Sequence, residues 1–343
     1  MQNRITTEGN LLDEKGRLVE CGYATSLIKA YDRSKIKAGK FRIKEWDYYL
    51  VYNSDYAVAI TVDDNSYMGL NSLTFIDFNR RIQITKSPME FMTNGKIGLP
   101  STSKQGDVVV KRKNYKFELL NDGMVRKIKV FMKNFKDGKD FYCEFDLTNE
   151  PKDSMVIITP FKEKETAFYY NQKIVGFKAV GKVFLGNEEI NFNDQSRAIL
   201  DWGRGVWTYK NTWYWGAGAG VVDGHEVGFN IGYGFGDTSQ ASENMVFVDG
   251  LAHKLEEVVF NIPKDKRGKD DFMNTWTFTS SDNRFVMSFV PIIDRHSNAN
   301  AVVISSNQHQ VFGKFNGTIV LDDGAKIELK DFLGFAEKVV NKW

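Results

Sequence analysis

Tight-turn dipeptides recur along this chain and restrict its fold more than any other sequence feature. Asp-Gly suits the two-residue turn of a β-hairpin, because the central residues of that turn need positive φ. Segments 141–147 and 326–332, which alternate apolar and polar residues as strands do, each follow such a turn. The pattern predicts an all-β, antiparallel architecture with few helices. The six turn signals are Asp122-Gly123, Asp137-Gly138, Asp223-Gly224, Asp249-Gly250, Asp282-Asn283 and Asp323-Gly324.

The 343 residues suggest two domains, and the composition changes near residue 195. The chain is Lys-rich before this point, and the densest Gly and Trp region follows it. We therefore expect an N-terminal β domain over 1–194 and a C-terminal one over 195–343. Segment 331–343 is compatible with a short amphipathic helix or a final strand, and its periodicity does not decide between them.

Charge and targeting signals exclude several classes of protein. The formal net charge is +2, which argues against a nucleic-acid binder. Residues 1–16 are polar, unlike a secretory signal, and the longest apolar run, 155–161, is far below the roughly 20 residues that span a bilayer. Two cysteines, Cys21 and Cys143, cannot form a disulfide framework. We expect a cytoplasmic protein without an integral membrane span; the oligomeric state stays open.

The hairpin around Asp223-Gly224 can be aligned residue by residue. With a two-residue turn, Phe229 faces Gly218, Ile231 faces Gly216 and Trp215 faces Gly232. Large residues opposite glycines favour a tightly curled barrel wall, although the glycines could instead clear space for a ligand. Asn230, the polar exception in this hairpin, needs a partner or a ligand, and it is a candidate ligand contact together with the nearby Tyr233.

The sequence contains only incomplete versions of known cofactor-binding motifs and no metal-binding motif. Segment 176–183 matches GxxxxGK, but it lacks the following Ser or Thr of a P-loop, and segment 232–236 is not a dinucleotide-binding GxGxxG. The four histidines have no metal-ligand spacing. We therefore expect neither a cofactor nor a metal.

One dense polar and aromatic motif, DWGRGVWTYKNTWYWG, occupies 201–216. A carboxyl group among aromatic rings is desolvated, which makes Asp201 a candidate proton donor. Arg204, three residues on, is expected to pair with Asp201 through a turn. That pair could equally serve only to lock the chain at the entry to a domain. Tryptophans of the motif are candidate ligand contacts: Trp202, Trp207 and Trp213.

Weaker candidates lie elsewhere in the chain. Glu45, beside Trp46 in KEWDYY, could face the same pocket as a catalytic carboxylate, with Trp46 as a ligand contact. His309 is a catalytic candidate, although a structural histidine is the simpler interpretation. Glu243 and Asn244 enter an apolar segment, where they either cap it or line a cavity.

Several segments together resemble an uncharacterised bacterial family known as a domain of unknown function. The resembling segments are 42–52, 201–216, 228–245, 276–285 and 312–343, so the resemblance covers essentially the whole chain. More distantly, the plan is similar to the calycin-like double-lipocalin group, which includes carotenoid hydratases, AttH-like proteins, tocopherol cyclase and Diels–Alderases. That resemblance implies two consecutive lipocalin-like β-barrels and cofactor-independent chemistry on apolar substrates.

Three functions are compatible with these features. The first is a hydratase, cyclase or isomerase that acts on a small apolar or polycyclic molecule, with Asp201 as acid, Arg204 orienting it and tryptophan faces stabilising a cation. The second is a non-catalytic protein that binds a hydrophobic ligand. The third is a carbohydrate-active protein in which Asp201 pairs with Glu45 or Glu243.

Overall fold

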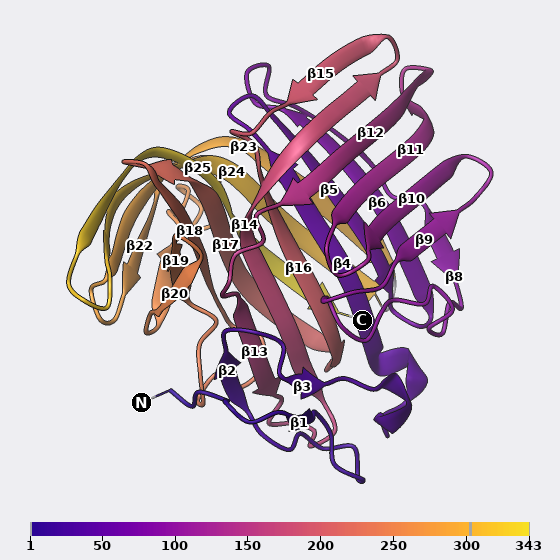
Figure 1. Ribbon diagram of the computed structural model, residues 1–343, viewed down its shortest axis with the longest axis vertical. Coiled ribbons are helices and arrows are strands. Elements are labelled where there is room, and N and C mark those ends of the chain that lie inside the picture. Colours follow the sequence, from indigo (N-terminus) through magenta and orange to yellow (C-terminus); the bar gives the residue numbers. More distant parts are fainter. Residues whose placement is uncertain (1, 302–303, 343) are drawn as a thin grey trace.

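The computed structural model describes residues 2–301 and 304–342, and the regular secondary structure of this part of the chain is almost entirely β-strand (Figure 1). It holds no α-helix, only two short 3₁₀ turns, η1 (Arg33–Lys35) and η2 (Lys40–Arg42). The strands form two large antiparallel sheets that follow one another in the sequence. The predicted all-β class with two consecutive lipocalin-like barrels is confirmed.

The first sheet is built from the N-terminal part of the chain. Its bonded order is β7 (Ile82–Lys86), β6 (Met68–Asp77), β5 (Tyr56–Asp64), β4 (Ile43–Tyr52), β16 (Arg197–Val206), β14 (Phe168–Leu185), β12 (Lys139–Thr148), β11 (Arg126–Lys136), β10 (Tyr115–Asn121) and β9 (Val108–Lys111). Side strands are β2 (Gly22–Ala24), β8 (Met89–Phe91), β13 (Met155–Pro160) and β15 (Glu188–Phe192), and β1 (Gly9–Asn10) pairs with β3 (Lys29–Ala30) separately. The sheet curls until the Lys86 ammonium on β7 reaches the Asn134 carbonyl on β11.

The second sheet contains the C-terminal strands. Its order is β20 (Leu251–Lys254), β19 (Met245–Val248), β18 (His225–Tyr233), β17 (Lys210–Val222), β25 (Lys326–Lys342), β24 (Ile304–Val320), β23 (Phe285–Ala301), β22 (Trp276–Ser280) and β21 (Val258–Asn261). This sheet also curls, and the curl brings Tyr233 on β18 against Phe260 on β21, with ring centroids 5.6 Å apart. Segment 331–343, left open by the sequence, continues β25 as a strand as far as the described residues reach.

Each of the six turn signals joins two antiparallel strands, as predicted. In the β17–β18 hairpin the turn residues Asp223 and Gly224 have φ of 50° and 85°. The predicted register holds from Val222–His225 through Trp215–Gly232, and the ladder ends one rung later. A Cβ on Gly218 would lie 3.0 Å from the Phe229 ring, so this glycine makes room for the barrel's own core.

The chain passes from the first sheet to the second between Val206 and Lys210. The expected boundary at 194/195 lies ahead of β16, which is bonded on both sides to strands of the first sheet. The motif at 201–216 therefore spans the crossing, with its first half on β16 and its second half on β17.

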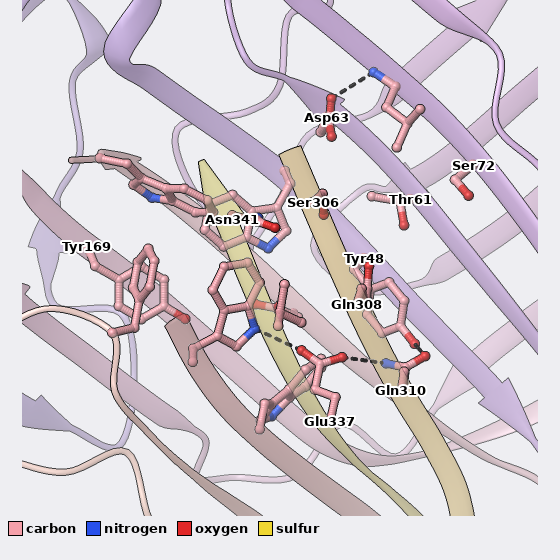
Figure 2. Close-up of a pocket in the computed structure, with 18 of the residues that line it drawn as sticks. Tyr48, Thr61, Asp63, Ser72, Tyr169, Ser306, Gln308, Gln310, Glu337 and Asn341 are labelled. Atoms are coloured by element: carbon pink, nitrogen blue, oxygen red, sulfur yellow. Dashed lines mark hydrogen bonds between the residues drawn. The ribbon is translucent and has the colours of Figure 1, made fainter. Parts of the chain in front are cut away.

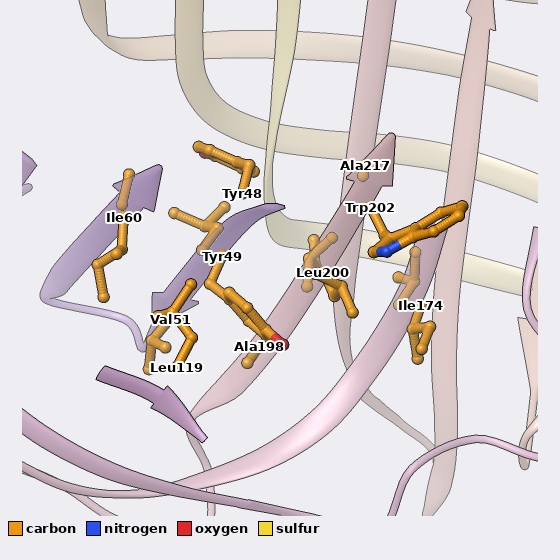
Figure 3. Packing of buried hydrophobic residues seen from close by; sticks show 14 of the residues in the cluster. Tyr48, Tyr49, Val51, Ile60, Leu119, Ile174, Ala198, Leu200, Trp202 and Ala217 are labelled. Atoms are coloured by element: carbon orange, nitrogen blue, oxygen red, sulfur yellow. The ribbon is translucent and has the colours of Figure 1, made fainter. Parts of the chain in front are cut away.

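Aromatic and aliphatic side chains fill both barrels. In the first, Tyr49, Leu200 and Trp202 pack together at 5% exposure or less (Figure 3). In the second, Phe229, Phe289 and Phe315 are fully buried, with ring centroids as close as 4.6 Å. Phenylalanine rings thus occupy much of the interior of the second barrel.

Candidate functional site

A cavity of about 210 Å³ lies between the two barrels (Figure 2). The first sheet lines it from β4, β5, β6, β14 and β16, and the second sheet lines it from β17, β23, β24 and β25. Its wall mixes aromatic rings with charged, amide and hydroxyl groups. The cavity therefore lies outside the barrel interiors, and its lining is more polar than the apolar pocket that the sequence suggested.

One rung of the first sheet supplies much of the polar wall. Side chains that are directly paired across neighbouring strands point to the same face of a sheet. The register aligns Lys173 with Asp201, Asp201 with Tyr48, Tyr48 with Thr61, and Thr61 with Ser72. All five side chains line the cavity.

The second sheet faces them with a matching rung. Here the register aligns Trp215 with Glu337, Glu337 with Gln310, and Gln310 with Arg295. These four side chains also line the cavity. Each of these two rungs runs across neighbouring strands of its own sheet, and the two rungs face each other across the cavity.

A buried ion pair lies on the first rung. The Lys173 ammonium is 2.9 Å from Oδ1 of Asp201, and the Asn171 amide donates to the same oxygen at 2.6 Å. The ammonium also lies 4.3 Å from the Trp215 ring centroid and donates to the Tyr169 hydroxyl at 3.3 Å. Lys173 is 3% exposed, so this cation is fixed inside the protein.

Two further carboxyl groups respond to the charges of that ion pair. Burial raises the pKa of Glu337 to about 7; its charged neighbours Lys173 and Asp201 act in opposite directions. Trp213 Nε1 and Gln310 Nε2 donate to its two oxygens at 2.9 and 3.1 Å, the latter bond visible in Figure 2. Burial likewise raises the pKa of Glu243, whose Oε2 has no hydrogen-bond partner among the described residues.

A fourth carboxyl group, Asp63, lies at another part of the wall. Burial raises its pKa to about 7, although the Leu70 amide donates to Oδ1 at 2.7 Å. The cavity therefore contains two carboxyl groups, Asp63 and Glu337, that exchange a proton near neutral pH.

Aromatic rings form the remaining part of the wall. Trp46 stacks on Tyr169 with centroids 6.1 Å apart and planes 12° apart, and Trp207 packs edge-on against both Trp46 and Phe235. Trp213 joins the same cluster through Phe235. Flat rings of this kind bind an apolar or aromatic ligand and stabilise positive charge above their faces.

Several residues singled out in the sequence meet in this cavity. They are Asp201, Glu243, Trp46, Trp207 and Trp213.

The prediction that Asp201 pairs with Arg204 is wrong. Both residues lie on the extended strand β16, where positions three apart point to opposite faces. Arg204 is fully buried on the far face, 3.0 Å from Asp47, and its guanidinium lies 4.3 Å from the Trp202 ring. Arg204 therefore cannot orient Asp201, and Trp202 belongs to the core of the first barrel.

Glu45 also points away from the cavity. It accepts a hydrogen bond from Tyr31 at 2.7 Å and forms an ion pair with Arg33. Its neighbour Trp46 faces the cavity instead, because side chains alternate along β4. Glu45 therefore cannot supply the second carboxylate beside Asp201.

Two other candidate residues, His309 and Asn230, form hydrogen bonds within the C-terminal part of the structure. His309 lies 2.7 Å from Asp294 on the face opposite Gln310. Asn230 accepts from Trp215 Nε1 at 2.7 Å and donates to the Glu243 carbonyl.

Two more side chains expected to contact a ligand, Asn244 and Tyr233, instead make contacts within the protein. Asn244 accepts from the Gly232 amide at 2.7 Å. Tyr233 stacks on Tyr214 with centroids 4.4 Å apart. Neither side chain lines the cavity.

Five important members of the site were not predicted from the sequence: Lys173, Glu337, Arg295, Gln310 and Tyr48. For Lys173 and Glu337 the available signal was a charged residue within a mostly apolar strand segment: Lys173 is the one charge in YYNQKIVGF, and Glu337 stands beside Lys338 in LGFAEKVV. Burying a charged side chain without a partner costs free energy, so such residues indicate a polar site. The partner, however, lies on another strand and is set by the register.

Clusters of metal-binding side chains and long apolar helices are absent from the described part of the chain. No group of three or more His, Cys, Asp or Glu side chains there is arranged to hold a metal ion. Nor does any helix in residues 2–301 or 304–342 have the length and apolar character needed to cross a bilayer.

The two barrels with a cavity between them have the calycin-like fold expected from the sequence, and two solved structures share it. An AttH-type protein of Nitrosomonas europaea is similar over 90% of this chain and 97% of its own, with 13% identity and a TM-score of 0.56. Kievitone hydratase of Nectria haematococca is similar over 97% of this chain and 98% of its own, with 10% identity and a TM-score of 0.53. At these identities the likeness shows the fold alone.

The sequence itself identifies the family. Residues 2–343 match the model of DUF2804, a domain of unknown function, and the chain belongs to that family. A search of curated protein sequences found no significant match.

Proposed function

We propose that this protein is an enzyme of the hydratase, cyclase or isomerase type, which moves a proton onto a small molecule bound between the barrels. The observation that carries the proposal is Glu337, a carboxyl group that is 3% exposed, lines the cavity and has a pKa raised to about 7. A group with a pKa near the working pH can both donate and accept a proton, as general acid–base catalysis requires.

The surrounding groups suit the charge that such a step creates. Protonation of an alkene or carbonyl group by Glu337 leaves positive charge on the substrate. Trp213 and Trp215 face the cavity and stabilise that charge through their rings, and the Asp201 carboxylate stabilises it directly. Lys173 holds Asp201 in place at 2.9 Å. This arrangement keeps Asp201 in the site but transfers the acid role from Asp201 to Glu337.

A hydration can be followed atom by atom. Glu337 gives its proton to one alkene carbon, and water adds to the neighbouring carbon. The added water then loses a proton to Asp201, and exchange with solvent returns both carboxyl groups to their starting states. The kievitone hydratase relative is a hydratase by name, which supports this reaction class for the shared fold.

The test starts from ligands carried by the protein. Native mass spectrometry of the purified protein, followed by solvent extraction, supplies compounds, and aryl alkenes and enones complete the panel. Each compound is incubated with protein in H₂¹⁸O and in D₂O, and products are read by mass. We expect ¹⁸O or deuterium incorporation that Glu337→Gln reduces by about 10²–10⁴-fold.

Two control variants make this test specific. Glu328→Gln changes an exposed carboxyl group on the same strand and should leave turnover unchanged. Asp63→Asn removes the other carboxyl group with a pKa near 7. Turnover that survives Glu337→Gln but not Asp63→Asn would refute the role of Glu337. A ligand that binds and always leaves unaltered would support the non-catalytic binding protein instead.

A further inference from the structure

Arg295 is a cation in the cavity wall that forms no ion pair with any described residue. Its guanidinium is fixed on two sides, because Nε donates to Thr74 at 3.1 Å and Nη1 donates to Gln310 at 2.9 Å. The side chain is half-buried and lines the cavity. Arg295 is thus held in one orientation, while its charge has no direct counterion in the described protein.

The nearest acidic groups are engaged elsewhere. Asp294, its neighbour on β23, points to the opposite face and binds His309 at 2.7 Å. Glu337 is separated from Arg295 by the neutral Gln310 amide, which contacts both. A partly buried guanidinium without a carboxylate partner is costly, and a ligand anion lowers that cost.

Polar groups with free hydrogen-bonding capacity line the same cavity as Arg295. Thr61, Ser306 and Gln308 line it, and their side chains form no hydrogen bond with the described residues. They come from β5 and β24, so both barrels contribute. Figure 2 shows Thr61, Ser306 and Gln308 along one side of the cavity and Tyr169 on another. One part of the cavity therefore suits a charged group, and the tryptophan cluster suits a flat apolar body.

We propose that the cavity binds an amphipathic organic acid, with its carboxylate on Arg295 and its apolar or aromatic body against the tryptophans. The planar guanidinium fork matches the geometry of a carboxylate, as it does that of a phosphate, and the aromatic wall of the same cavity suits the organic body of an acid. This inference deepens the proposed function, since it assigns a substrate class to the same cavity. It differs from the small apolar or polycyclic molecule expected from the sequence in giving the ligand one charged end.

Isothermal titration calorimetry on the full-length chain tests this proposal with 2-naphthoate and its neutral isostere 2-naphthamide. We expect the wild-type protein to bind the acid at least tenfold more tightly than the amide. Arg295→Gln should abolish that preference while the amide still binds, and Arg295→Lys should retain part of it. Arg267→Gln, at a guanidinium that is 78% exposed elsewhere, is the matched control and should change nothing.

Three results would overturn the proposal: equal affinities of acid and amide in the wild type, an undiminished preference in Arg295→Gln, or no binding of either compound. The wild-type comparison remains decisive even if Arg295→Gln fails to fold. Neither probe carries an isolated alkene, so the result is independent of turnover. A preference for the acid together with full activity of Glu337→Gln would retain the anion site and reject only the catalytic proposal.

Discussion

The raised pKa of Glu337 makes a quantitative prediction about stability. Burial lifts this pKa from an ordinary 4.5 to about 7, so the folded protein holds a proton that the unfolded chain releases. The stabilising contribution of that proton is fully present below pH 4.5 and is lost as the pH rises through 7. At 1.36 kcal/mol per pKa unit, the whole change amounts to about 3 kcal/mol.

Glu337→Gln isolates this contribution, because a glutamine resembles the protonated acid and does not titrate. Urea denaturation of both proteins at pH 5, 6, 7 and 8 measures the difference in unfolding free energy. We expect the variant to gain about 2–3 kcal/mol relative to wild type between pH 5 and pH 8. Glu328→Gln, at an exposed site, should show no such trend.

Urea carries no charge, so it leaves the electrostatics of the cavity unscreened during this measurement. Tryptophan fluorescence and circular dichroism should give coincident transitions if the two barrels unfold together. A difference between Glu337→Gln and wild type that stays constant from pH 5 to pH 8 would refute the reasoning, since Glu337 would then titrate at its ordinary pKa.

Three further substitutions test the architecture through urea denaturation. Lys173→Met should destabilise the fold by about 3–5 kcal/mol, since it leaves a buried carboxylate without its cation, and a loss below 1 kcal/mol would contradict a buried ion pair. Arg204→Met should cost a similar amount, because it leaves the Asp47 carboxylate unpaired. It should nevertheless leave ligand binding intact, because Arg204 and Asp47 lie on the face of the first sheet that points away from the cavity. Gly203→Ala places a Cβ 2.0 Å from the Trp46 ring, so it should cost at least about 1–3 kcal/mol and weaken binding of any aromatic ligand; unchanged stability would show that Trp46 is not fixed there.

Local chemistry explains why so much of the fold was predictable. Asp-Gly turns fix both the direction reversal and the register, so the β17–β18 hairpin could be aligned residue by residue from Asp223 and Gly224 alone. The same approach failed for Asp201 and Arg204, because a strand, unlike the expected turn, places residues three apart on opposite faces.

The site was less predictable because its contacts are distant in sequence. Asp201 meets Lys173 through the β14–β16 register and Tyr48 through the β16–β4 register. A strand shifted by one residue would turn every side chain to the other face. No local pattern around Asp201 specifies which residue of β14 it opposes.

The two sheets contribute different groups to the cavity, which gives a reason for joining two barrels in one chain. The first sheet supplies the Lys173–Asp201 ion pair, and the second supplies Glu337 and Arg295. Burial raises the pKa of Glu337, while Lys173 and Asp201 of the other sheet act on it in opposite directions, so the protonation of this acid depends on residues of both sheets. The interior of the second barrel is packed with buried apolar side chains, many of them phenylalanine rings. Neither barrel alone would bring an acid, a carboxylate and an anion-binding guanidinium to one cavity, so any activity of this kind belongs to the intact pair.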